Sequence, residues 1–140
     1  MTVAKDYFLT TFQTLHVGAG WYGGRNLDRF SMYQFGLFDE VRMHGVPSAG
    51  IRMPELALLR GSYSFNVFEQ YRLDLFLDEA YGSLLGDETR RRWLTGTGVA
   101  VNFKAPWNTM VKVDVGKSFL PAPLSAAGSV VLQVLVLKPL

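Results

Sequence analysis

The stretch that decides the fold class is residues 71–81, YRLDLFLDEAY. Its side chains alternate between two faces, with Tyr71, Leu73, Leu75 and Leu77 on one and Arg72, Asp74 and Asp78 on the other. A period of two residues is the pattern of a β-strand whose faces meet different surroundings. The stretch therefore predicts a strand with one apolar and one polar face.

The same period runs through most of the chain, and a helical period is almost nowhere present. It predicts seven strands, at residues 7–22, 31–38, 58–68, 71–81, 94–104, 109–119 and 129–137. The intervening segments read as a turn at 23–26, a long loop at 39–55, a charged loop with a possible helical turn at 82–92, a hairpin turn at 106–108 and a loop at 121–128. We expect a single all-β, antiparallel domain over residues 1–140.

Composition excludes several classes of protein. Charged residues make up 19% of the chain, the net charge is +2 and there is no cysteine. Nothing here favours nucleic-acid binding, disulfide frameworks or thiolate metal sites. No apolar run reaches the roughly 18 residues that a transmembrane helix needs. Residues 1–16 lack the features of a secretory signal, so we expect any such signal to have been removed or to lie upstream.

Alternation by itself fits two kinds of β-protein, which differ in the face that they turn inward. Strands of about 9–11 residues and a polar face rich in Gly, Ser and Asn favour a transmembrane barrel. Aromatic residues near the strand ends suit the girdles of such a barrel: Tyr22, Phe68, Tyr71, Tyr81, Trp93, Trp107 and Phe119.

The alternative is a soluble barrel or sandwich that holds an apolar ligand. Its interior would be formed by Tyr63, Phe65, Leu73, Leu75, Val99, Val101, Val111 and Val113. A third interpretation is a structural subunit of an envelope complex.

The C-terminal half resembles the end of the bacterial surface-antigen family of outer-membrane barrels. Residues 71–81, 96–104, 105–107 and 111–120 carry the resemblance, at positions Asp78, Gly96, Gly98, Pro106, Asp114 and Gly116. Upstream, residues 35–46 resemble the family's loop motif through Arg42 and Gly45, in a spacing similar to the barrels attached to patatin-like phospholipases. The resemblance extends over roughly residues 30–140.

Two positions depart from the family pattern. Val46 stands where the family has an aromatic residue, and the chain ends Lys138-Pro139-Leu140 without a terminal aromatic. The family's barrel also has sixteen strands. The seven strands expected here would have to pair with the remainder of a barrel, associate with copies of themselves, or close as a small barrel with an eighth strand.

The resemblance implies that the loop folds into the barrel interior and that Arg42 binds an acidic residue of the inner wall. Asp74, Asp78 and Asp114 are candidates, and a guanidinium can bind a carboxylate through two parallel hydrogen bonds. The competing interpretation for Asp74 and Asp78 is pairing with Arg60, Arg72 or Lys112 on neighbouring strands.

The resemblance also implies a function: anchoring, translocating or assembling a passenger protein at the bacterial outer membrane, with lipid as a partner. The residues suggest no catalytic, cofactor or metal site. His16 and His44 are the only histidines, and their spacing suggests no metal centre.

Overall fold

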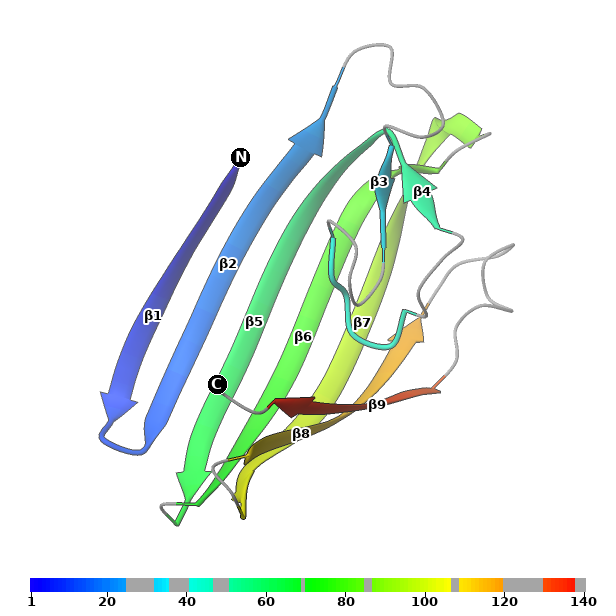
Figure 1. The fold of residues 1–140 in the computed structure, drawn as a ribbon. Helices are drawn as coiled ribbons and strands as arrows, with labels where there is room; N and C mark the ends of the chain where they lie inside the picture. The colour runs from blue at the N-terminus through cyan, green and yellow to red at the C-terminus, as the bar shows by residue number, and fades with distance from the viewer. Residues whose placement is uncertain are drawn as a thin grey trace.

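The computed structural model describes residues 1–24, 32–35, 41–46, 51–68, 70–84, 87–106, 109–119 and 130–137. Seven strands form one antiparallel sheet in the order β1-β2-β5-β6-β7-β8-β9 (Figure 1). Their bounds are β1 Thr2–Thr10, β2 Gln13–Gly23, β5 Glu55–Val67, β6 Tyr71–Leu84, β7 Asp87–Ala105, β8 Thr109–Phe119 and β9 Val130–Leu137. Two short strands, β3 (Tyr33–Gln34) and β4 (Arg52–Met53), form a separate pair.

The all-β, antiparallel prediction is confirmed, and β6 and β8 begin at the residues that the sequence predicted. Two strand predictions were wrong. Residues 7–22 are not one strand, because the chain reverses between Thr10 and Gln13 to form the β1–β2 hairpin. Residues 31–38 do not supply a strand of the main sheet, since their described part forms only β3.

The charged loop predicted at 82–92 was also wrong. β6 continues to Leu84, about one residue past the start of β5, and β7 begins at Asp87, eight residues beyond its last pair with β8. Arg91 is held at this end by an ion pair with Glu55 of β5, at 2.6 Å. The β7–β8 hairpin was correctly predicted, as Ala105 pairs with Thr109. Trp107, Asn108 and residues 121–128 lie outside the described residues.

The register of the sheet gathers the apolar residues on one face. Leu75, for example, lies beside Tyr63 and Val99, which is in turn beside Val115. Asp78 and Asp114, which have the opposite parity, contact residues 41–46. The apolar residues, and the others of the predicted soluble interior, are therefore on the face away from that segment, which lies in front of the sheet together with β3 and β4 (Figure 1). We call this apolar face the outer face. Many of its side chains are exposed, including Leu77 (51%), Val99 (43%) and Leu132 (65%).

The inner face is covered in part by the chain between β2 and β5. At one end of the sheet, a buried apolar cluster joins that segment to the strands: Phe35, Val41, Met43, Val46, Ile51, Met53, Leu56, Leu58, Ala80 and Leu94. Val46 is only 2% exposed within this cluster. Tyr22 also packs against it, so the prediction that Tyr22 belongs to an outer girdle was wrong.

The hairpins at the other end of the sheet reveal a regular stagger. Their last pairs are Thr10–Gln13, Val67–Tyr71 and Ala105–Thr109. The rows of paired residues run across the sheet and give a common scale for the three hairpins. On that scale, each hairpin closes about two residues further toward this end of the sheet than the one before it, and successive hairpins are two strands apart. When the turns are set in one plane, a stagger of about one residue per strand corresponds to a strand tilt of about 35°.

No helix in the described part of the chain has the length and hydropathy to cross a membrane.

Candidate functional site

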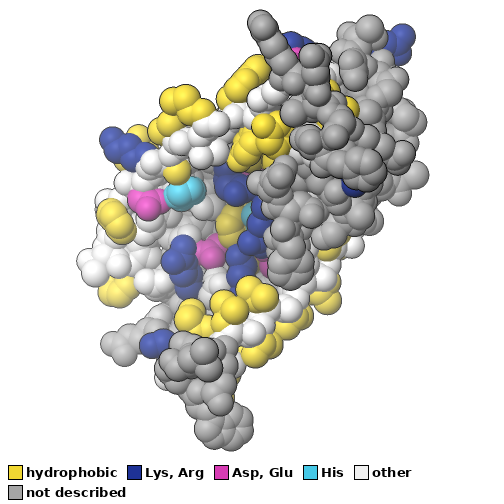
Figure 2. Space-filling model, turned by 45° about the horizontal axis from the view of Figure 1, so that its top comes forward, with side chains coloured by type: hydrophobic (Ala, Val, Ile, Leu, Met, Phe, Trp, Pro, Cys, Tyr) yellow, Lys and Arg dark blue, Asp and Glu magenta, His cyan; other side chains and the backbone are white. Residues whose placement is uncertain are grey.

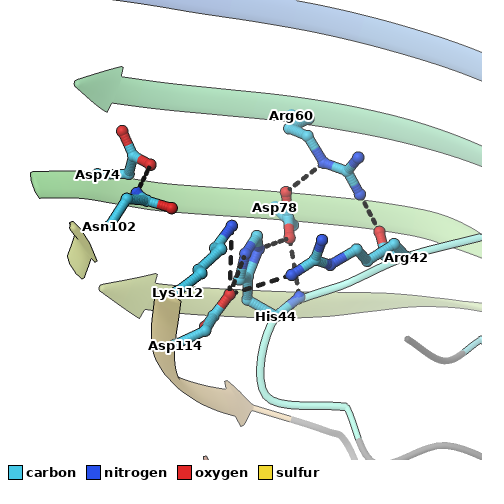
Figure 3. Close-up of polar contacts among 8 residues, drawn as sticks. All are labelled: Arg42, His44, Arg60, Asp74, Asp78, Asn102, Lys112 and Asp114. Atoms are coloured by element: carbon cyan, nitrogen blue, oxygen red, sulfur yellow. Dashed lines mark hydrogen bonds and ion pairs between the residues drawn. The ribbon is translucent and has the colours of Figure 1, made fainter. Parts of the chain in front are cut away.

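The candidate site lies where residues 41–46 (the docked loop) cross the inner face of β5–β8. Figure 2 shows Lys and Arg side chains gathered with acidic residues and histidine in a hollow, with hydrophobic side chains around it. Figure 3 shows the loop bringing Arg42 and His44 against acidic residues of the sheet. The alternation of β6 and β8 directs Asp78 and Asp114 toward the loop, because both occupy the polar parity of their strands.

Asp78 is the most fully buried acidic residue of the site, with no exposed surface. Its Oδ2 accepts hydrogen bonds from the backbone N–H of His44 at 2.9 Å and from His44 Nδ1 at 2.6 Å. Its Oδ1 accepts one from Arg60 Nε at 2.9 Å. A buried carboxylate is costly unless charged or polar donors surround it, and Asp78 has three. Asp78 therefore joins the loop to β5 and β6.

Asp114 provides the second acidic contact, from β8. Its Oδ2 accepts a hydrogen bond from Arg42 at 3.1 Å and lies 3.9 Å from Lys112 Nζ. His44 Nε2 is 3.3 Å from the same oxygen, an ion-pair distance without the alignment of a hydrogen bond. Arg42 therefore contacts one of its three predicted acidic partners.

His44 lies between the two carboxylates. Its ring stacks on Phe76 with centroids 4.0 Å apart and an interplanar angle of 15°, and Lys112 Nζ lies 5.1 Å from the centre of the same Phe76 ring. Burial works to lower the pKa of His44, but its interactions with Asp114 and Asp78 outweigh burial and raise the pKa above 6.5. An imidazolium can donate from both ring nitrogens, which suits a position between two acids.

Glycines of β7 and β8 allow the loop to approach the sheet so closely. A side chain at Gly96 or Gly116 would collide with the backbone of His44 or Gly45, and a Cβ at Gly98 would lie 3.0 Å from His44 Cδ2. Gly45 itself has φ +73°, and its carbonyl accepts a hydrogen bond from Ser118 Oγ at 2.6 Å. The glycines that carry the family resemblance thus form the floor beneath the loop.

Asp74 belongs to a separate network near the hairpin end of the sheet. It accepts hydrogen bonds from Arg72 Nε and from Asn102 Nδ2, both at 2.7 Å, and Arg72 also donates to Ser64 Oγ at 2.8 Å. For Asp74, the structure therefore favours pairing between neighbouring strand residues over contact with Arg42. Beside this network the inner face has an open depression of about 370 Å³, lined in part by Asn66, Lys104 and Met110.

All seven predicted site residues lie at the inner face or on the docked loop. Arg42, Gly45, Asp78, Asp114 and Lys112 come together, whereas Arg72 and Asp74 form the second network. The competing interpretation is confirmed for Asp78, because Arg60 donates a hydrogen bond to it. Sequence reasoning did not foresee that Arg60 also donates to the carbonyl of Arg42 in the docked loop, and it missed His44.

His44 was the more important omission, because it was considered only as a metal ligand. Its position between Arg42 and Gly45 of the loop motif was a signal that it would share their environment. Among the described residues, no group of three or more His, Asp or Glu side chains is arranged to hold a metal ion. The cluster is a set of charge-assisted contacts that fastens a loop to a sheet.

Comparison of the chain with models of protein families, with curated proteins and with solved structures gave no match.

Proposed function

We propose that this chain forms part of a bacterial outer-membrane β-barrel that anchors a passenger protein, or helps to translocate or assemble one, and is not itself an enzyme. In this proposal the outer face contacts lipid and the inner face lines a polar interior that holds the docked loop. The observation that carries the proposal is an apolar belt on the outer face, bounded by two levels of aromatic residues.

Outward aromatic residues gather at two levels of the sheet. Trp21, Tyr81 and Trp93 share one register row and Phe119 is two residues from it; with the stagger applied, all four lie within about three residues of one another, at the upper level. The stagger brings Tyr7, Phe65, Tyr71 and Phe103 to within about one residue of one another, at the lower level. The levels are roughly nine residues apart along a strand, which is about 25 Å after correction for the tilt. An outer-membrane barrel has an apolar band of about 25 Å between two aromatic girdles.

The residues between the two levels are almost all apolar. They include Val17, Leu73, Leu75, Leu77, Val99, Val101, Val113, Val115, Leu132 and Val134. The outward polar residues lie near the upper aromatic level, where contact with water is available. They are Glu79, Thr95, Thr97 and Lys117.

Lys5 lies on the outer face of β1, two residues from Tyr7 of the lower aromatic level. Its Nζ is 5.0 Å from the ring centre of Tyr7, so the ammonium extends toward the lower aromatic level. A lysine near a membrane interface can place its charge in water in this way.

The inner face supports the same proposal from the opposite side. Buried acids, arginines and a histidine occupy the face that a soluble apolar-ligand barrel would fill with hydrophobic side chains. The contact between Arg42 and Asp114 is also what the resemblance to the surface-antigen family leads us to expect. We therefore favour the membrane barrel over the soluble alternative.

Spin labels in membranes that contain the protein test the proposal. A label at L75C should be accessible to oxygen, which concentrates in lipid, and inaccessible to a water-soluble nickel complex. N102C, on the inner face of the neighbouring strand β7, is the matched control and should show the opposite preference.

The tilt adds a second requirement to the same experiment. Tyr7 and Leu75 share one row of the register through Leu15 and Tyr63. The proposal nevertheless places Y7C near the interface and L75C near the middle of the belt. Nickel access at L75C equal to that at N102C would exclude the membrane proposal, and equal depths at Y7C and L75C would exclude the tilt.

A further inference from the structure

The two ends of the sheet bear on how such a barrel would close. β1 and β9 are the outermost strands, and each has a neighbour on one side only among the described residues. Every adjacent pair in the seven-stranded sheet is antiparallel. Because direction alternates along an odd number of strands, β1 and β9 have the same direction in the sheet.

This shared direction limits what can close the sheet. If β1 paired directly with β9 of the same chain, the pair would be parallel. A second copy in the same membrane orientation has its strands in the same directions, so β1 of one copy would also be parallel to β9 of the other. Bacterial outer-membrane barrels are antiparallel throughout. Direct pairing of β1 with β9 does not satisfy that pattern, and neither does a ring of two copies.

The composition of β9 indicates that its free edge is built to be covered. Residues 130–137, VVLQVLVL, contain no charge and no proline. Val130, Leu132, Val134 and Val136 are 60–65% exposed. Exposed edge strands usually carry lysine, proline or a bulge that blocks further pairing, and β9 has no lysine or proline. An open edge with free backbone N–H and C=O groups is also not tolerated in lipid.

We infer that the free edges of β1 and β9 are joined by a further β-sheet with an odd number of strands, antiparallel to this sheet at both seams. Along each joining strand, apolar and polar side chains alternate, and the apolar side chains continue the belt on the lipid side. They come from polypeptide other than these seven strands, and not from a single second copy. This inference rests on the proposed membrane function and selects among the ways in which the barrel could be completed.

Photo-crosslinking from β9 tests the inference in membranes of cells that make the protein. The variants L132→p-benzoylphenylalanine and V136→p-benzoylphenylalanine each place a probe on β9, and mass spectrometry identifies the peptide joined to each. We expect both peptides to come from one alternating segment outside β1, with the two joined residues in reverse order relative to Leu132 and Val136. Reverse order is the signature of an antiparallel seam.

Three results would overturn the inference: a joined peptide from β1, joined residues in the same order as Leu132 and Val136, or no protein product from either position. A probe at Leu75 is the matched control, because mid-sheet strands already have both neighbours and should give only products within the sheet. Equal access of the nickel complex to the spin labels at L75C and N102C would instead exclude the membrane proposal, so the two failures are distinguishable.

Discussion

The molecule contains two histidine–aspartate pairs in very different settings. His16 and Asp6 face each other across the β1–β2 hairpin, with Nδ1 2.5 Å from Oδ1, and their side chains are 37% and 53% exposed. His44 and Asp78 make a contact of similar length, 2.6 Å, but are 5% and 0% exposed. Distance alone therefore says little about the importance of such a pair. What differs is desolvation and the number of groups that depend on each acid.

The largest expected effect comes from removing the charge of each acid in turn. Asp78→Asn leaves His44 and Arg60 without their buried counter-ion, so it should reduce the free energy of unfolding by about 3–5 kcal/mol. Asp6→Asn affects an exposed pair and should cost less than about 1 kcal/mol. Urea titrations of the protein in membranes isolated from cells that make it, followed by gel mobility, measure both. Equal losses would mean that burial does not distinguish the two pairs.

A glycine near each pair gives an intermediate effect. Gly45→Ala places a side chain at φ +73° and against the backbone of Lys117 and Ser118, which should cost about 1–3 kcal/mol. Gly18→Ala, beside His16, meets its nearest neighbours at 3.6 Å or more, so we expect a change below about 0.5 kcal/mol. The same urea titration measures both changes. A Gly45→Ala protein as stable as Gly18→Ala would contradict the close docking of the loop.

The smallest expected effect is a dependence on pH that arises from His44. Because the folded-state pKa of His44 is raised, its contribution to loop docking is fully present below pH 6.5 and declines as pH rises through the folded value. The difference in unfolding free energy between the wild type and H44N should therefore shrink as pH increases. The ¹³C-labelled ring resonances, assigned with H44N and H16N, report the titration directly. A His44 midpoint at or below 6.5 would refute the prediction.

Much of the sheet could be predicted from the sequence, because a period of two residues determines which side chains share a face. The outer positions of β5–β8 follow directly from that period. The β1–β2 hairpin could not be predicted, since Thr10, Thr11 and Phe12 include none of the usual turn residues. The ends of β6 and β7 were missed because the dense charge of residues 87–92 suggested a solvated loop.

The candidate site could be predicted less completely than the sheet. Strand parity placed Asp74, Asp78 and Asp114 on one face, but it could not say which of them would meet Arg42. That choice depends on how residues 41–46 cross the sheet, which is fixed by contacts between segments far apart in the chain. The seven-strand total also matched for the wrong reason, since residues 31–38 were counted while the β1–β2 hairpin was taken as one strand.

The docked loop has a mechanical consequence. Hydrogen bonds in a sheet join only adjacent strands, so a sheet can flatten or curl with little change in any single pairing. The loop instead connects non-adjacent strands: Arg60 of β5 and Asp78 of β6 hold one part of it, and Asp114 and Ser118 of β8 hold another. The loop spans the inner side of the sheet from β5 to β8. Because its six residues fix the distance between these strands, they limit the curvature that β5–β8 can adopt.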